Sequence, residues 1–173
     1  MSKTGWKDIA EIIGIAAIVA SLVFVGLELR QSQQIAIAGQ YQQRAESFVG
    51  QLYSRLPLEA EQERLAEMVR STYSDVIDPS VLESMSDQRI ALDFVRASAD
   101  GTTFDNNYFQ YQSGTMSDDG WQAMRGRLKR ALRTSPFLRA EMLTRGERYR
   151  ESFRNLCDEL LAEIAMENRG TSN

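Results

Sequence analysis

The run Ile12–Leu27 constrains the fold of this chain more than any other feature, because its sixteen residues include no charged side chain. Ten of the sixteen are Ile, Val, Leu or Phe, and each such residue favours insertion of a helix into lipid by about 0.3 to 0.6 kcal/mol. Insertion of the whole run is therefore favourable by roughly 3 to 6 kcal/mol. The sequence predicts a membrane-spanning helix here.

The predicted span is longer than the uncharged run. Sixteen helical residues rise about 24 Å, whereas the hydrocarbon core of a bilayer is roughly 30 Å thick. Extending the helix to Ile9–Leu29 gives about 31 Å and places Glu11 and Glu28 near its ends, where carboxylates reach headgroups and water. Trp6 and Arg30 have the chemistry of interfacial anchors. We expect the span to cover about residues 9–29.

Two other interpretations of an apolar N-terminal run are a helix buried in a soluble core and a cleaved signal peptide. The residues Glu28 to Gln31 after the run contain no small-x-small cleavage pattern, which favours a retained anchor. Positive charges lie on both sides, with Lys3 and Lys7 before the span and Arg30 and Arg44 after it. The positive-inside bias therefore leaves the side of the soluble domain open.

Small residues follow one face of the predicted span at a 4-3-4 spacing. The face consists of Ala10, Gly14, Ala17 and Ser21 and continues through Phe24 to Glu28. Small side chains let another helix approach closely, which favours helix association in lipid. We expect this face to dock against other transmembrane helices, either of a larger complex or of a second copy.

The same repeat continues beyond the span. Its positions are Gln31, Ile35, Ala38, Gln42, Ala45, Val49, Leu52 and Leu56. No proline occurs before Pro57, so one helix is predicted from about Trp6 to Leu56. Residues 31–56 would form either a coiled-coil stalk or the inner face of a helix that packs on its own downstream domain, and the sequence favours the two equally.

The remaining chain shows helical periodicity, and no alternating strand pattern of useful length is present. Start signals predict helices over 57–73, after Asp78-Pro79, from Ser86 to Ser113-Gly114 with a weak point at Gly101, after Ser117, after Ser135-Pro136, and over 147–167. The predicted fold class is all-α, with a long N-terminal transmembrane helix, a stalk and a small helical-bundle domain. We divide the chain into an anchor (1–30), a stalk (31–56), a soluble domain (57–167) and a frayed tail (168–173).

Composition argues against catalysis. The chain has no histidine and one cysteine, Cys157, which excludes histidine-dependent triads, histidine metal sites and thiolate clusters. Cys157 follows Phe153 and Leu156 at helical spacing and is expected to be a buried structural residue. Glycines are dispersed, so no phosphate-binding loop is present. We predict no catalytic residue, no metal and no cofactor.

Charge is divided between two parts of the chain, although the net charge is only −4. Residues 57–119 hold thirteen acidic and four basic side chains, whereas residues 125–154 hold ten basic and three acidic ones. The basic stretch Arg125, Arg127, Lys129, Arg130 and Arg133 is a candidate for contact with anionic lipid headgroups. Balancing by the acidic half is the favoured alternative, and nucleic acid is not an expected partner because no binding motif accompanies the stretch.

A family resemblance supports the anchor. Residues 11–32 read EIIGIAAIVASLVFVGLELRQS and resemble the N-terminus of a widespread family of small bacterial single-span, membrane-anchored helical proteins of unknown function. Similar later stretches are Asn107–Gly114, Trp121, Ser135-Pro136 and Arg148–Phe153. The chain departs from the family at Ala140-Glu141, where relatives carry a bulky aromatic pair. The resemblance implies a single-pass protein of the bacterial cytoplasmic (inner) membrane and no specific activity.

Two functions agree with these features. The favoured one is a non-catalytic membrane-anchored subunit or scaffold that docks through its transmembrane helix into a larger assembly, homomeric or heteromeric. The alternative is a membrane-anchored enzyme or small-ligand-binding module with a site among the aromatic residues Tyr108, Tyr111 and Trp121. Aromatic residues are also needed to fill a core of this size, which favours the subunit.

Overall fold

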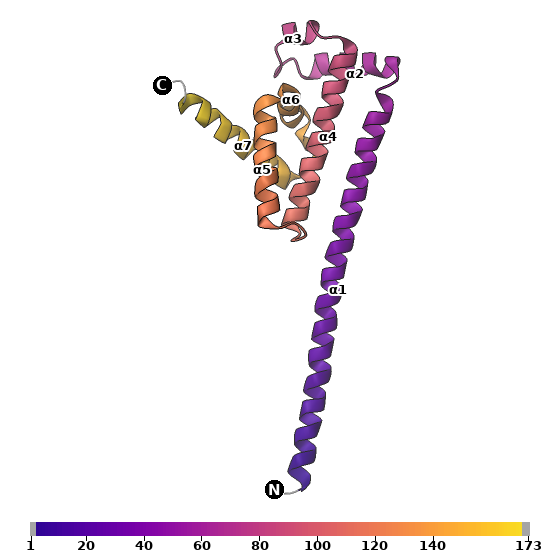
Figure 1. The fold of residues 1–173 in the computed structure, drawn as a ribbon, viewed down its shortest axis with the longest axis vertical. Coiled ribbons are helices and arrows are strands. Elements are labelled where there is room, and N and C mark those ends of the chain that lie inside the picture. The colour runs from indigo at the N-terminus through magenta and orange to yellow at the C-terminus, as the bar shows by residue number, and fades with distance from the viewer. Residues whose placement is uncertain (1–2, 171–173) are drawn as a thin grey trace. The chain divides into compact units, whose positions relative to one another are not determined.

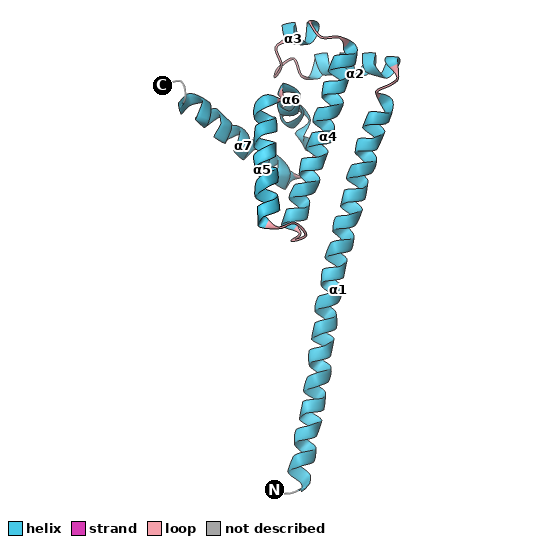
Figure 2. Ribbon diagram, in the orientation of Figure 1, coloured by secondary structure: helices cyan, strands magenta, loops and turns pink. Residues whose placement is uncertain are grey.

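Helices joined by short loops make up the part of the protein that the computed structural model describes, residues 3–170, and no strand occurs there (Figures 1 and 2). The prediction of an all-α chain is therefore confirmed. The helices are α1 (Lys3–Arg55), α2 (Glu59–Thr72), α3 (Pro79–Glu83), α4 (Asp87–Gln112), α5 (Asp118–Thr134), α6 (Pro136–Arg145), the 3-10 turn η1 (Gly146–Arg148) and α7 (Glu151–Gly170). The chain forms two compact units, Met1–Gln40 and Tyr41–Asn173.

The first unit consists of the N-terminal part of α1. This helix is long and apolar enough to cross a membrane, and none of its most apolar window is buried within the structure. Large apolar side chains are exposed all along it; Ile12, Leu22 and Leu27, for example, are 62 to 67% exposed. The prediction of a single helix from about Trp6 to Leu56 agrees with the observed bounds of α1.

In the second unit, the four helices α3 to α6 begin at the predicted capping residues. Asp78 precedes α3 and accepts a hydrogen bond from the Ser80 backbone N–H at 2.9 Å. Ser86, Ser117 and Ser135 cap α4, α5 and α6 in the same way, each through its hydroxyl oxygen. These caps satisfy backbone donors that the first turn of a helix leaves unpaired. All four predicted starts are confirmed.

The C-terminal helix differs from the prediction. A helix was expected from Glu147, but the structure has the turn η1 there, and α7 begins only at Glu151. Tyr149 between them has an extended backbone, and its hydroxyl donates to Glu141 at 2.9 Å. The interruption between η1 and α7 therefore falls at the residue whose side chain reaches the buried Glu141 carboxylate. At the other end α7 continues to Gly170, so part of the tail expected to fray is helical, and residues 171–173 lie outside the described residues.

Gly101 is the point where α4 was expected to be weak, yet the helix passes through it without interruption. A Cβ atom built on Gly101 would lie 2.6 Å from the Tyr149 hydroxyl oxygen and 2.9 Å from Cε of Met142. Glycine therefore serves close packing rather than a helix break, because only a residue without a side chain leaves room for Tyr149.

The core of the second unit lies among α2, α4, α5, α6 and α7, with Tyr73, Leu128, Leu138 and Phe153 fully buried. Ala45 and Val49 of α1 are partly buried, and Leu52 and Leu56 pack against this core. Over residues 45–56, the repeat therefore faces the protein's own domain, as one of the two interpretations of that segment predicted.

Candidate functional site

The predicted helix-docking face belongs to the first unit, and its side chains Ala10, Gly14, Ala17, Ser21, Phe24 and Glu28 are all exposed. A Cβ atom on Gly14 would meet no atom within 4 Å. No other part of the described chain therefore requires glycine at this position. The Ser21 hydroxyl donates to the Ala17 carbonyl at 2.9 Å, which satisfies its polar group inside the helix. Ala17 and Ser21 also line a shallow hollow of about 300 Å³.

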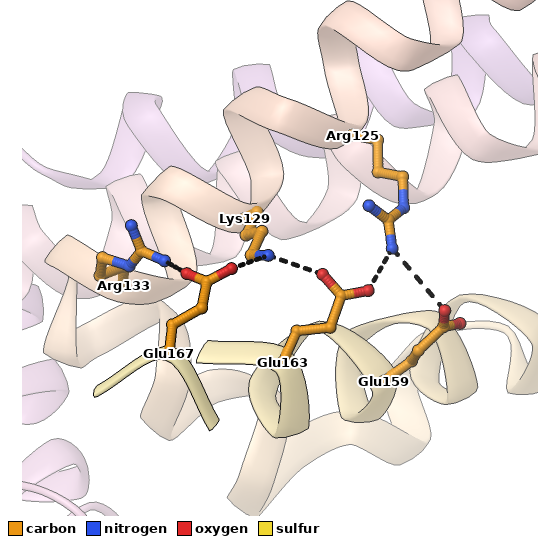
Figure 3. Close-up of polar contacts among 6 residues, drawn as sticks. All are labelled: Arg125, Lys129, Arg133, Glu159, Glu163 and Glu167. Atoms are coloured by element: carbon orange, nitrogen blue, oxygen red, sulfur yellow. Dashed lines mark hydrogen bonds and ion pairs between the residues drawn. The ribbon is translucent and has the colours of Figure 1, made fainter. Parts of the chain in front are cut away.

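Three of the five residues in the predicted basic stretch form ion pairs with a row of glutamates. Figure 3 shows Arg125, Lys129 and Arg133 of α5 facing Glu159, Glu163 and Glu167 of α7. Both rows repeat every four residues, so each lies along one face of its helix. We call these six residues the α5–α7 ladder.

Lys129 is central to the ladder. Its ammonium group lies 2.7 Å from carboxylate oxygens of both Glu163 and Glu167. Hydrogen bonds from Lys129 and Arg125 lower the pKa of Glu163, and a hydrogen bond from Lys129 lowers the pKa of Glu167. The same two carboxylates raise the pKa of Lys129. Both helices are therefore linked by charge-assisted contacts at their exposed edge.

The source of charge balance differs from the expectation. The ladder glutamates belong to α7, not to the acidic region 57–119. Arg127 and Arg130 are exposed, and neither forms an ion pair within the described residues. Of the five candidates for headgroup contact, these two have side chains that no glutamate already holds.

A buried carboxylate that the sequence interpretation did not single out lies in the second unit. Glu141 of α6 is 0% exposed and accepts hydrogen bonds from Tyr73 directly after α2, from Ser98 of α4 at 3.2 Å and from Tyr149 at 2.9 Å. An Arg148 guanidinium nitrogen lies 3.5 Å from the same carboxylate. We call these five residues the Glu141 cluster.

The Glu141 cluster satisfies the requirement that a buried charge be paired and hydrogen-bonded. Burial raises the pKa of Tyr73 and Tyr149 well above the ordinary value, and the negative charge of Glu141 raises it further. Both phenols therefore stay protonated and act as donors. A sequence signal existed: Glu141 lies four residues after Phe137 and three after Leu138, on the buried face of its helix.

The aromatic residues of the alternative site pack against one another. The rings of Tyr108 and Tyr111 lie 4.9 and 5.2 Å from the Trp121 ring, and Trp121 is only 4% exposed. Tyr108 also packs beside the fully buried Phe153. These distances are typical of aromatic pairs in a protein core, so the contacts support a structural role for the cluster.

The single thiol is also part of the core. Cys157 is 1% exposed, and burial raises its pKa to about 12. Such a thiol is a poor nucleophile, as expected for a structural cysteine. Within the described residues, no group of three or more acidic or cysteine side chains is placed to hold a metal ion.

No protein-family model, curated protein or solved structure matches this chain. The resemblance of residues 11–32 to a family of bacterial membrane-anchored proteins therefore stays a prediction.

Proposed function

We propose that this chain is a non-catalytic, single-pass membrane subunit, anchored by residues 9–29, whose helical-bundle domain takes part in a larger membrane assembly. The observation that carries the proposal is that large apolar side chains are exposed on all sides of the N-terminal part of α1. Ile12, Ile18, Leu22 and Phe24 are each more than 60% exposed. An isolated helix that is apolar all round is stable in lipid and unfavourable in water.

Exposure also supports an anchor over a buried core helix. A core helix of equal hydrophobicity would have its apolar side chains covered by the rest of the chain, whereas Val19 and Val23 are 54 and 59% exposed. The resemblance to bacterial membrane-anchored proteins supports the cytoplasmic membrane as the location. The exit sequence Glu28–Gln31 supports retention of the anchor.

The proposed partner is another transmembrane helix. Gly14 and Ala17 present a surface without large side chains, on which a second helix backbone could approach closely. A single span has no second helix of its own to cover this surface. Docking therefore joins the chain either to a larger membrane complex or to further copies of itself.

Membrane insertion can be tested by placing charges inside or outside the predicted span. The variant Val19→Arg/Val23→Arg puts two charges at its centre, each of which costs about 2.5 to 3.5 kcal/mol there. We expect this variant to leave the membrane fraction, while the wild-type chain resists alkaline carbonate extraction. The matched control is Ile35→Arg/Ile37→Arg, which changes two equally exposed residues of α1 beyond the span. Equal membrane retention of both variants contradicts the proposal.

Docking can be tested separately, by particle mass in mild detergent. Gly14→Leu/Ala17→Leu fills the small-residue face and is expected to reduce the assembly to a smaller particle. Gly26→Leu is the control, since Gly26 lies on a different face of the same helix and a Cβ atom there meets no neighbour. An unchanged particle mass for the double variant contradicts docking through this face, whether or not the chain is inserted in the membrane.

A further inference from the structure

Two hollows in the second unit adjoin at one pair of residues. The first has a volume of about 280 Å³ and the second about 330 Å³, and Phe48 and Arg148 line both. The Arg148 guanidinium lies over the Phe48 ring, 5.5 Å from its centroid. We call the two hollows together the arginine groove.

Positive charge dominates the groove. Arg44 lines the first hollow, whereas Arg55 and Arg145 line the second. Within the described part of the chain, no carboxylate lies within ion-pair distance of these three side chains. The acidic residue of the first hollow, Asp105, is already paired with Arg150 at 2.9 Å. The groove therefore has an excess of guanidinium groups.

Arg145 is the partly buried arginine of the three, and most of its donor capacity is unused. Its side chain is partly buried, and its contacts are a hydrogen bond of 3.2 Å to the Met68 sulfur and a position 5.2 Å above the Phe94 ring. A guanidinium carries five N–H donors in a planar fork that matches a carboxylate or a phosphate. A sulfur atom and an aromatic face leave most of this capacity unused, so the site is suited to an anion.

Apart from Gln51, the side chains that line the second hollow beside its arginines are apolar. Phe48, Leu52, Leu65, Met68 and Phe94 line it beside the arginines. A free inorganic anion would gain nothing from these side chains. An alkyl chain would cover them and gain roughly 25 cal/mol for each Å² of apolar surface removed from water.

We propose that the arginine groove binds a small amphipathic anion, with its carboxylate or phosphate head between Arg145 and Arg148 and its hydrocarbon tail along Phe48 and Leu52. Binding of the head breaks no strong contact of Arg145, whose hydrogen bond is to the Met68 sulfur. It gives Arg148 a second anionic contact beside the one with Glu141 at 3.5 Å. The site lies wholly within residues 41–173, so it does not depend on the membrane proposal. The anion could come from a free fatty acid or from an anionic lipid headgroup.

The test uses the full chain in phosphatidylcholine nanodiscs, titrated with oleate labelled with ¹³C at the carboxylate. We expect a protein-bound carboxylate resonance that saturates at one oleate per chain. In a second arm, phosphatidylglycerol replaces part of the lipid. Competition by this lipid identifies a headgroup phosphate as the source of the anion, whereas undiminished oleate binding identifies a free carboxylate.

Variants locate the site. Arg145→Gln is expected to weaken oleate binding at least tenfold, because a charge-assisted hydrogen bond contributes about 1.5 to 3 kcal/mol and 1.4 kcal/mol corresponds to a tenfold change. Arg44→Gln/Arg55→Gln removes two exposed charges, so it tests the groove without disturbing the core, and should weaken binding severalfold. Arg96→Gln is the matched control, since Arg96 is an exposed arginine that lines neither hollow, and this variant should bind as wild type.

Two results overturn the proposal. The first is a pair of negative results. No saturable carboxylate resonance appears, and the ³¹P signal of phosphatidylglycerol is the same with the wild-type chain as with the Arg145→Gln variant. The other is binding of undiminished strength in both Arg145→Gln and Arg44→Gln/Arg55→Gln, which would place the anion elsewhere. Near-ultraviolet circular dichroism of each variant establishes that its core is folded.

Discussion

The hydroxyl of Tyr73, the residue directly after α2, donates a hydrogen bond to the carboxylate of Glu141 on α6, although the two residues are 68 positions apart in the sequence. Ser98 of α4 and Tyr149, just before α7, donate to the same carboxylate. One buried charge therefore fixes the positions of elements from across the second unit. Burying this charge is tolerable only because several donors reach it at once.

Replacing Tyr73 by Phe should destabilise the second unit by about 1 to 3 kcal/mol, because a buried acceptor loses one of its donors. Trp121 is a suitable reporter, since it is 4% exposed, in a Trp6→Phe background that removes the second tryptophan. The measurement is denaturant unfolding of the full chain in detergent, followed by Trp121 fluorescence. Tyr53→Phe, at a tyrosine that is 43% exposed, is the control and should leave the midpoint unchanged. Equal midpoints for both variants would show that the hydrogen bond contributes nothing.

Helix starts could be predicted from the sequence because their signals are local. Asp78-Pro79 and Ser135-Pro136 combine a capping side chain with a proline at the first helical position, and both begin helices in the structure. The all-helical fold follows from the same kind of evidence. Neither the capping residues nor the helical periodicity depends on which helices pack against one another in the fold.

Pairings between helices could not be predicted in the same way. The basic stretch was expected to be balanced by residues 57–119, but α7 supplies the partners. The matching four-residue spacing of Glu159, Glu163 and Glu167 is visible in the sequence, yet it gains meaning only once α5 and α7 are known to be adjacent. The arginine groove is a stronger case, because Arg145 and Arg55 are ninety positions apart.

Two glycines should respond to alanine with opposite signs. Gly101→Ala is expected to destabilise the second unit by about 1 to 3 kcal/mol, because its Cβ atom would lie 2.6 Å from the Tyr149 hydroxyl oxygen. Gly126→Ala, within α5 and with nothing within 4 Å of the new atom, should stabilise it by roughly 0.5 to 1 kcal/mol. Denaturant midpoints in detergent give both values. Stabilisation by Gly101→Ala would contradict the close packing.

Acid should weaken the α5–α7 ladder. Contacts with Lys129 and Arg125 hold the pKa of Glu163 below the value of 4.5 that is typical of an unfolded chain. A group with a lowered folded pKa contributes its full stability above the unfolded pKa, and loses it as the pH falls through the folded pKa. Stability should therefore decline below about pH 4.5. Glu163→Gln should make this decline shallower, while Glu147→Gln, at an exposed residue outside the ladder, should not. Identical slopes for wild type and Glu163→Gln would show that the ladder carries no such linkage.

Cys157 should report global opening of the second unit. Its thiol is 1% exposed and its pKa is raised to about 12 by burial, so at about pH 8 the folded chain holds almost no accessible thiolate. We expect a disulfide reagent to label the native full chain slowly and the denatured chain at once. Labelling should accelerate in Gly101→Ala, because that substitution lowers the free energy of opening, and it should not accelerate in Gly126→Ala. Rapid, complete labelling of the native chain would mean that Cys157 lies outside a stable core, since neither burial nor its raised pKa would then protect the sulfur.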